Sequence, residues 1–170
     1  EQTLVMDLRN PLDQIRKGLD RKWRGHLNKA ERAQTTLSEG TGWELFEQFS
    51  PIHEELQQRR RISGTKSVST LWQIQELLPE EAKMRVVLCH ESGQLTAGII
   101  VSCVGRTGVT LARATTPAGR RSGAAYLVHW RAVQILKDCG CHSYDLSGVN
   151  KQNNPGPFSY KRGLCGRNGR

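Results

Sequence analysis

The sequence predicts an α+β fold in which a mixed, mostly antiparallel sheet is flanked by helices. Three observations support this prediction. Apolar residues recur at three- and four-residue steps through much of the first half of the chain, which is typical of amphipathic helices. From Met84 the pattern changes to apolar runs separated by short polar turns, which indicates an antiparallel meander. One further helical segment and one further strand follow, and this segregation of helices and strands characterises α+β domains.

The size of the chain favours a single domain over residues 1–170. Its 170 residues, of which 36% are hydrophobic, are enough for one core and too few for two. Because the chain begins with Glu1, we expect it to be part of a longer two-domain protein or truncated at one or both ends. No apolar run approaches the roughly 18 residues of a membrane span, and no signal-peptide pattern is present, so we expect a cytoplasmic protein.

The first half of the chain predicts one strand followed by helices. Residues 3–8 alternate as a strand does, and Asn10-Pro11 then favours a helix start. The apolar spacing predicts helix over residues 12–30, with a break at Gly18 to Asp20. The next helical region, residues 43–61, is expected to restart at Ser50-Pro51. Residues 62–69 are predicted to form a loop, and residues 71–78 a helix that ends before Pro79.

The second half predicts the sheet. Strands are expected at residues 85–90, 95–104 and 109–114, joined by hairpin turns, with a bulge at Gly98. A long helix is expected over residues 122–139, and residues 144–149 form the next predicted strand.

The composition favours an anionic partner. Lys and Arg number 25 against 16 Asp and Glu, for a formal net charge of +9. A basic surface of this kind suits tRNA, nucleotide-linked precursors, coenzyme A or anionic lipid head groups, and charge alone does not choose among them.

The five cysteines predict neither a disulfide framework nor a metal site. Cys89 and Cys103 fall inside apolar strand-like runs, which favours reduced thiols. The spacing of Cys139, Cys141 and His142 is narrower than that of common zinc sites, and no second pair exists. The alternative interpretation of Cys139-Gly140 is the C-terminus of a helix.

The first candidate site is an anion cradle between the third meander strand and the long helix. A helix N-terminus there would present unpaired N–H groups, small residues would let a phosphate approach, and arginines would add charge-assisted hydrogen bonds. The residues concerned are Arg120, Arg121, Gly123 and Ala125. The alternative is a helix capped by Ser122 with solvated arginines.

The second candidate site follows the strand at residues 144–149. A turn-rich loop leads into Tyr160-Lys161-x-Gly163, a layout that could hold a cation rigidly at a strand end. There Lys161 could neutralise a phosphate or stabilise an oxyanion, or it could be a solvated basic turn. Asp145 could act as a base or an orienting group, or could cap a turn.

The third candidate site is the basic face of residues 22–32. Arg24 and Lys29 could clamp a diphosphate or an RNA backbone, and Trp23 could stack on a base. Alternatively this face is solvated surface, and Trp23, which has core spacing, is buried.

These motifs together resemble the Fem family of peptidoglycan-bridge aminoacyltransferases, whose halves have the acetyltransferase (GNAT) fold. The family pattern Asp-x-Gly-Gly, a Pro-Gly turn and Phe-Lys-x-Gly-Phe-Gly is similar to the stretch from Tyr144 to Gly166, in which Ser147, Tyr160 and Leu164 replace one Gly and two Phe. Arg120-x-x-Gly123-x-Ala125 resembles the superfamily signature for the coenzyme A pyrophosphate, and the segment around Arg24 resembles a Fem Lys-x-Arg-x-x-x-x-Lys-Ala element.

The resemblance implies a GNAT-like acyltransferase domain, the second of a two-domain protein. It implies that aminoacyl-tRNA is the donor and that the acceptor is a lipid- or nucleotide-linked peptidoglycan precursor, with a peripheral location at the inner face of the membrane. In this view the acceptor amine attacks the acyl carbonyl directly, Lys161 lies at the acyl-donor site, and Tyr160 contacts substrate. No permanently bound cofactor is expected. The alternatives are an N-acetyltransferase that uses acetyl or acyl coenzyme A on a small amine, and a non-catalytic RNA-binding module.

Overall fold

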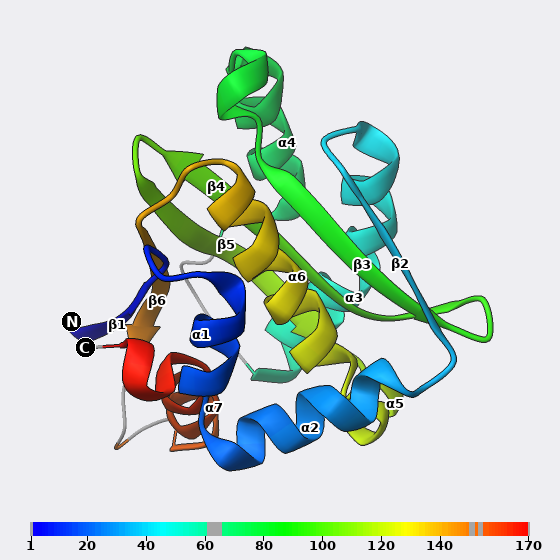
Figure 1. Ribbon diagram of the computed structural model, residues 1–170. Coiled ribbons are helices and arrows are strands. Elements are labelled where there is room, and N and C mark those ends of the chain that lie inside the picture. The colour runs from blue at the N-terminus through cyan, green and yellow to red at the C-terminus, as the bar shows by residue number, and fades with distance from the viewer. Residues whose placement is uncertain (1, 61–65, 150–151, 153–154, 170) are drawn as a thin grey trace.

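A six-stranded mixed sheet with the strand order β1-β6-β5-β4-β3-β2 forms the centre of the computed structural model (Figure 1). The structure describes residues 2–60, 66–149, 152 and 155–169. The strands are β1 (Gln2–Asp7), β2 (Thr35–Gly40), β3 (Arg85–Glu91), β4 (Gln94–Val104), β5 (Thr107–Thr115) and β6 (Ser143–Val149). All neighbours are antiparallel except β5 and β6, which run parallel.

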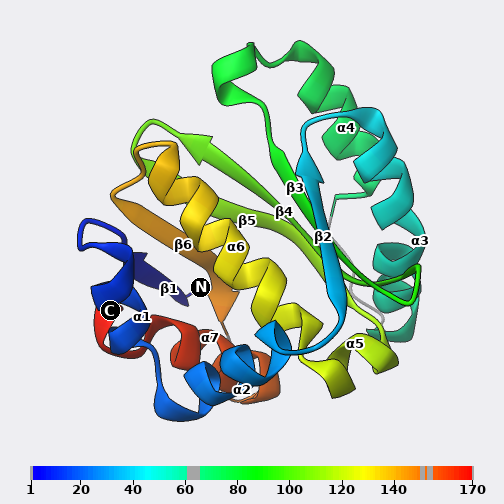
Figure 2. The same cartoon turned by 45° about the vertical axis from the view of Figure 1, so that its right-hand side comes forward.

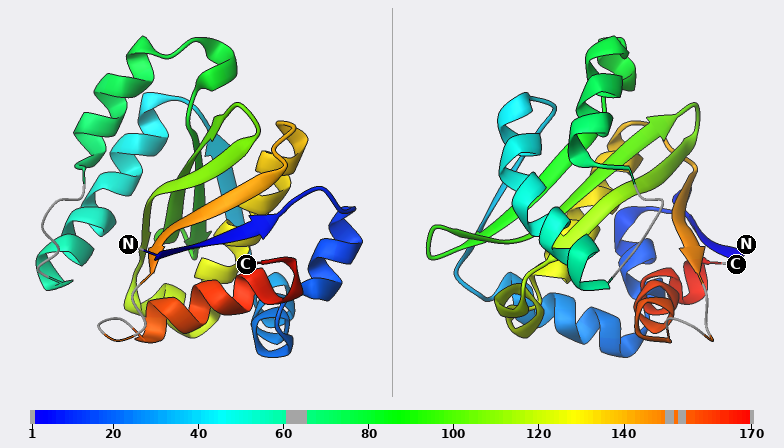
Figure 3. Two further views of the ribbon diagram at one scale, coloured as in Figure 1. Left: turned by 90° about the vertical axis from the view of Figure 1, so that its left-hand side faces the viewer. Right: turned by 180° about the vertical axis from the view of Figure 1, so that it is seen from behind.

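Helices cover both faces of the sheet (Figures 2 and 3). One face carries α1 (Leu12–Gly18), α2 (Arg21–Glu31), α6 (Ala124–Asp138) and α7 (Pro155–Cys165), and the other carries α3 (Trp43–Arg60) and α4 (Val68–Leu77). The short α5 (Pro117–Ser122) follows the end of β5, and the 3₁₀ turns η1 (Glu80–Ala82) and η2 (Gly166–Asn168) precede β3 and follow α7. Each face has its own apolar core.

The predicted fold class is confirmed, and so is most of the expected order of elements. The helical break lies where Gly18 and Asp20 indicated, because Asp20 caps α2 by accepting the N–H groups of Lys22 and Trp23. The meander of β3, β4 and β5 is antiparallel as expected. The α6 helix ends at Asp138, with Cys139 as its C-cap and Gly140 at a φ of +80°, which is a glycine-favouring helix end.

The structure corrects five expectations. The α3 helix runs through Pro51 without restarting, because Phe46, Phe49 and His53 are buried on one continuous face. Gly98 is not at a bulge. It pairs regularly with Leu88, and a Cβ there would lie 2.5 Å from the ring of Phe49.

The other three corrections concern helices. The long helix begins at Ala124, after the separate α5, rather than at Ser122. Residues 155–165 form α7 rather than a turn-rich segment, with Pro155 and Pro157 in the first turn, where a missing N–H costs little. The expected turn at Asn154 lies outside the described residues, as does the first half of the loop expected at residues 62–69. In the second half of that loop, α4 begins at Val68, earlier than the predicted residue 71. The strand β2 was not predicted.

Candidate functional site

Within the described residues, the parallel strands β5 and β6 pair only along the first three residues of each strand. Cα partners are Thr107 with Ser143, Gly108 with Tyr144 and Val109 with Asp145. Beyond this point side chains link the strands, since the Tyr144 hydroxyl lies 2.8 Å from that of Thr110, and the Ser147 hydroxyl donates to the Thr110 carbonyl at 2.7 Å. In the part of the chain that the structure describes, no backbone ladder therefore joins β5 to β6 beyond Val109 and Asp145, although β5 remains paired with β4 and β6 with β1.

Lys161 of α7 points at the C-terminal end of β6. Its side chain is buried, with 7% of the residue exposed, and its Nζ donates to the carbonyl oxygens of Ser147 at 3.1 Å and Gly148 at 2.9 Å. The solvated-turn interpretation of Lys161 is thus wrong. The structure does hold a cation rigidly at a strand end, although a helix rather than a loop carries it.

Asp145 shapes the strand end that receives Lys161. Its Oδ1 accepts the backbone N–H of Ser147 at 2.7 Å and the hydroxyl of Thr3. Ser147 has a φ of +62°, which is uncommon for a residue other than glycine. The carboxylate stabilises this backbone conformation, so Asp145 caps the bend whose carbonyl groups bind Lys161.

Tyr160 joins α7 to α6. Its hydroxyl donates to the Ala125 carbonyl at 2.8 Å and lies 2.8 Å from Nδ1 of His129. Burial raises the pKa of Tyr160 well above its ordinary value, so the phenol stays protonated. The guanidinium of Arg113, from β5, lies 5.5 Å from the centre of the Tyr160 ring, within cation–π range.

His129 is the buried imidazole of this site. Burial lowers its pKa well below the ordinary value, and the positive charges of Arg113 and Lys161 lower it further. It is therefore neutral at neutral pH. Sequence reasoning missed Arg113 and His129, because nothing in their local sequence connects them with Lys161. Only the packing of α6 and α7 against β5 and β6 brings these side chains together.

The predicted anion cradle is built differently from the expectation. The N–H groups of Gly119 and Arg120 donate to the Thr116 hydroxyl and carbonyl, and that of Gly123 donates to the Gly119 carbonyl. Gly123 is also buried beneath α2, where a Cβ would lie 3.2 Å from the Cβ of Ala30. Three N–H groups of the segment are thus used inside α5, while the side chains of Arg120 and Arg121 are exposed.

The alternative interpretation of that segment is also only partly right. The arginines are exposed, but Ser122 does not cap a helix. Its hydroxyl has two acceptors within hydrogen-bond distance, the Glu91 carboxylate and the Gly119 carbonyl. Ala125 is a backbone anchor for the Tyr160 hydroxyl.

The basic helix α2 separates its two candidate residues. Arg24 and Lys29 are five positions apart, about 140° around a helix. Arg24 lines a cavity of about 550 Å³ between α2 and α7 that Lys29 does not line. Trp23 is buried, with 3% of the residue exposed, and packs against Tyr126 and Tyr160. The prediction of burial from its core spacing is confirmed, and the alternative that it stacks on a base is wrong.

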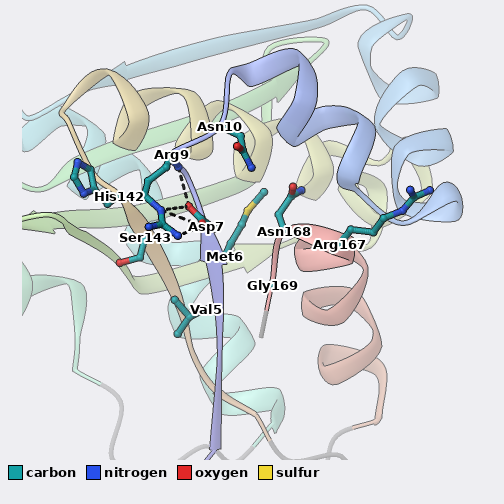
Figure 4. Close-up of a pocket in the computed structure, with 10 residues that line it drawn as sticks. All are labelled: Val5, Met6, Asp7, Arg9, Asn10, His142, Ser143, Arg167, Asn168 and Gly169. Carbon is teal, nitrogen blue, oxygen red and sulfur yellow. Dashed lines mark hydrogen bonds and ion pairs between the residues drawn. The ribbon is translucent and has the colours of Figure 1, made fainter.

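A second cavity, of about 460 Å³, lies beside β1 and η2 (Figure 4). Its Arg9 is paired with Asp7, at 2.6 Å between Nη2 and Oδ2. None of the residues predicted from the sequence to act in catalysis or binding lines this cavity.

The described residues hold no cluster of three or more His, Cys, Asp or Glu side chains suited to a metal ion. They also include no helix that combines the length and apolarity required to cross a bilayer.

Comparison with known proteins gives the family. The model of a family described as an acetyltransferase (GNAT) domain matches residues 15–162. The chain belongs to this GNAT family. It is an acyltransferase domain. No curated protein sequence matches the chain.

Solved structures show the same fold at low sequence identity. FemX superposes with a TM-score of 0.84 at 12% identity, over 99% of this GNAT domain and 58% of FemX. L-PGS from Bacillus licheniformis superposes with a TM-score of 0.60 at 15% identity, over 95% of this domain and 55% of L-PGS. The aminoglycoside 6'-N-acetyltransferase AAC(6')-IG from Acinetobacter haemolyticus superposes with a TM-score of 0.53 at 18% identity, over 76% of this domain and 88% of that enzyme. The chain thus spans somewhat more than half the length of FemX and of L-PGS, and the fold implied by the Fem resemblance is confirmed.

Proposed function

We propose that this GNAT domain is a Fem-like N-acyltransferase that transfers an aminoacyl group from aminoacyl-tRNA to an amine of a peptidoglycan precursor. The observation that carries the proposal is the buried Lys161, anchored on the last carbonyl groups of β6. A fixed cation in a site from which water is excluded stabilises developing negative charge far better than a solvated one. The similarity to FemX over 99% of the chain supports the same class of chemistry.

In the proposed reaction the acceptor amine attacks the ester carbonyl of the donor. A C–N bond forms, negative charge develops on the carbonyl oxygen, and Lys161 stabilises that charge. The C–O bond to the tRNA ribose then breaks, and the ribose oxygen leaves with the proton that the amine gives up. Asp145 acts as a positioning residue, because it holds the Ser147 bend that orients Lys161. Tyr160 contacts the donor from α7, and Arg120 and Arg121 bind donor phosphates with their side chains.

A coenzyme A-dependent N-acetyltransferase is the second candidate function, because the matching family model is described as an acetyltransferase domain. The N–H groups of Gly119, Arg120 and Gly123 are used within α5. A coenzyme A pyrophosphate held near this segment would therefore depend on the exposed side chains of Arg120 and Arg121 and on the start of α6.

The deciding experiment measures acyl transfer by the purified protein with aminoacyl-tRNA and with acetyl coenzyme A as donors. With aminoacyl-tRNA and a nucleotide-linked peptidoglycan precursor, we expect transfer, and we expect Lys161→Met to lower kcat by about 10²–10³-fold. Arg106→Gln, which changes an exposed cation at the β4–β5 turn, is the control and should leave the rate unchanged.

Two results would contradict the proposal. Transfer from acetyl coenzyme A alone would support the second candidate function. Binding of tRNA with no transfer, weakened only slightly by Lys161→Met, would support a non-catalytic RNA-binding module. Thermal melting of Lys161→Met separates a lost charge from a lost fold, since this side chain is buried.

A further inference from the structure

The cavity between α2 and α7 is surrounded by cations. Of its lining residues five are basic and one is acidic, and they come from α1, α2, α7, η2 and the residue that caps α2. These residues are Lys17, Arg21, Arg24, Arg162, Arg167 and Asp20. The volume of about 550 Å³ lies within the usual range for small-molecule sites.

The positive charge around this cavity is largely unbalanced within the described residues. Lys17 has a carboxylate partner, Asp13 at 3.3 Å, whereas none of the four arginines pairs with a carboxylate of the described residues. Asp20 uses its Oδ1 to cap α2, by accepting the N–H of Lys22 at 2.9 Å. Several like charges around one hollow repel one another, and an anion bound there would relieve that repulsion.

The walls of the cavity are held by backbone contacts. The N–H of Asp20 donates to the Gly163 carbonyl at 2.9 Å, and Asn168 donates through its side chain to the Ile15 carbonyl at 2.8 Å. Gly166 lies so close to the α1–α2 junction that a Cβ would stand 2.1 Å from the Gly18 carbonyl oxygen. The backbone that carries these cations is therefore held in place before a ligand binds, which lowers the entropy cost of binding.

One guanidinium is already oriented. Arg24 is partly buried, and its Nη1 donates to the Lys17 carbonyl at 2.8 Å. A guanidinium has five N–H donors in a planar fork, so this single bond leaves the others able to bind phosphate oxygens. Phe158 and Ser159 complete the wall on the α7 side.

We propose that this cavity binds a phosphate ester group, either a diphosphate or a phosphodiester, of a substrate of the enzyme. The inference rests on the proposed function, because it assigns this group to a molecule that also reaches Lys161. The two places lie on different faces of α7. Arg162 lines the cavity, while the neighbouring Lys161, about 100° away around the helix, points to β6. A substrate anchored by its phosphate must therefore extend part of the way around this helix to react.

The test is calorimetric titration of the purified protein with inorganic pyrophosphate at low and at raised salt. We expect binding that weakens with salt, and a roughly tenfold or greater loss of affinity in Arg162→Gln and in Arg24→Gln. Arg106→Gln removes the same charge from an exposed position outside the cavity and should change the affinity less than twofold. Lys161→Met should also retain pyrophosphate binding.

Parallel titrations with uridine diphosphate and with a short single-stranded RNA distinguish a diphosphate from a phosphodiester. If the protein binds uridine diphosphate or the RNA more tightly than pyrophosphate, the result supports the proposal. Absence of pyrophosphate binding, or an equal loss in Arg106→Gln and Arg162→Gln, would overturn it. Because the titration needs no acyl transfer, the phosphate site can stand if the proposed function fails, and the reverse also holds.

Discussion

The hydroxyl of Tyr160 lies 2.8 Å from Nδ1 of the buried His129. The same hydroxyl donates its proton to the Ala125 carbonyl, so its oxygen must accept a proton from Nδ1. This arrangement fixes His129 as the neutral tautomer that carries its proton on Nδ1. It also ties α7, which carries Lys161, to the first turn of α6.

Tyr160→Phe should therefore destabilise the protein although the ring is kept. The substitution leaves the Nδ1–H of His129 buried without an acceptor, which costs about 1–3 kcal/mol. Urea unfolding would measure this as a lower free energy of unfolding. Tyr126→Phe is a matched control, because that tyrosine packs against Trp23 and Tyr160 in the same cluster and its hydroxyl has no hydrogen bond among the described residues. Equal losses in the two variants would show that the Tyr160 hydroxyl bonds contribute nothing specific.

The free energy of unfolding should fall as the pH is lowered from about 6.5 to 5. Burial lowers the pKa of His129 and of His53 in the folded protein, so the unfolded chain binds more protons in this window. Each histidine contributes at most about 1.4 kcal/mol per pH unit. His129→Gln should flatten the slope measured by denaturant unfolding at several pH values, while His53 maintains part of it. An unchanged slope would mean that His129 is protonated in the folded state.

Two glycine substitutions should have opposite effects on stability. In Gly119→Ala the new Cβ would lie 2.3 Å from the Thr96 carbonyl oxygen, which also accepts the N–H of Thr116 at 2.9 Å, so we expect a loss of about 1–3 kcal/mol. Gly25 lies within α2 with open space around it, and Gly25→Ala should add up to about 1 kcal/mol. Thermal melting of both variants checks the pair, and a stable Gly119→Ala protein would contradict the close packing of α5 on β4.

Cys103 and Cys141 should form a disulfide on oxidation. Their Sγ atoms are 2.9 Å apart, although all five cysteines are free thiols. With oxidised glutathione, one thiol forms a mixed disulfide and the other displaces glutathione, so two glutathione thiols are released per bond. Burial, with a contribution from Cys103, raises the pKa of Cys141 to about 12, so the reaction should be slow at neutral pH.

The measurement for this pair is a free-thiol count and intact mass in a Cys139→Ser background, which removes the exposed thiol. We expect the loss of two thiols, and no such loss when Cys141→Ser is added. A lasting glutathione adduct in place of the protein disulfide would show that the two thiols do not meet.

Much of the fold could be predicted because local patterns decide it. Apolar spacing located α1, α2 and α6, and the Asp20 cap located the break between α1 and α2. The strand β2 could not be found in this way, since Thr35 to Gly40 has one large apolar residue and forms a strand by pairing with β3. The α7 helix was missed because its prolines and glycines resemble a turn, whereas burial of Lys161, Leu164 and Cys165 against the sheet makes it a helix.

The sequence by itself determined the fold class and the excess of positive charge, and it indicated Lys161, near the end of a strand, as a candidate site residue. Only the tertiary structure decided that Arg113 of β5 and His129 of α6 lie near the Tyr160-Lys161 pair of α7, and that Arg24 and Arg162 face one cavity while Lys29 does not. The physical reason is that these residues lie on different elements. The distances between them depend on where β5 and β6 stop pairing and on how α2, α6 and α7 pack. Local sequence patterns predict neither of these two features.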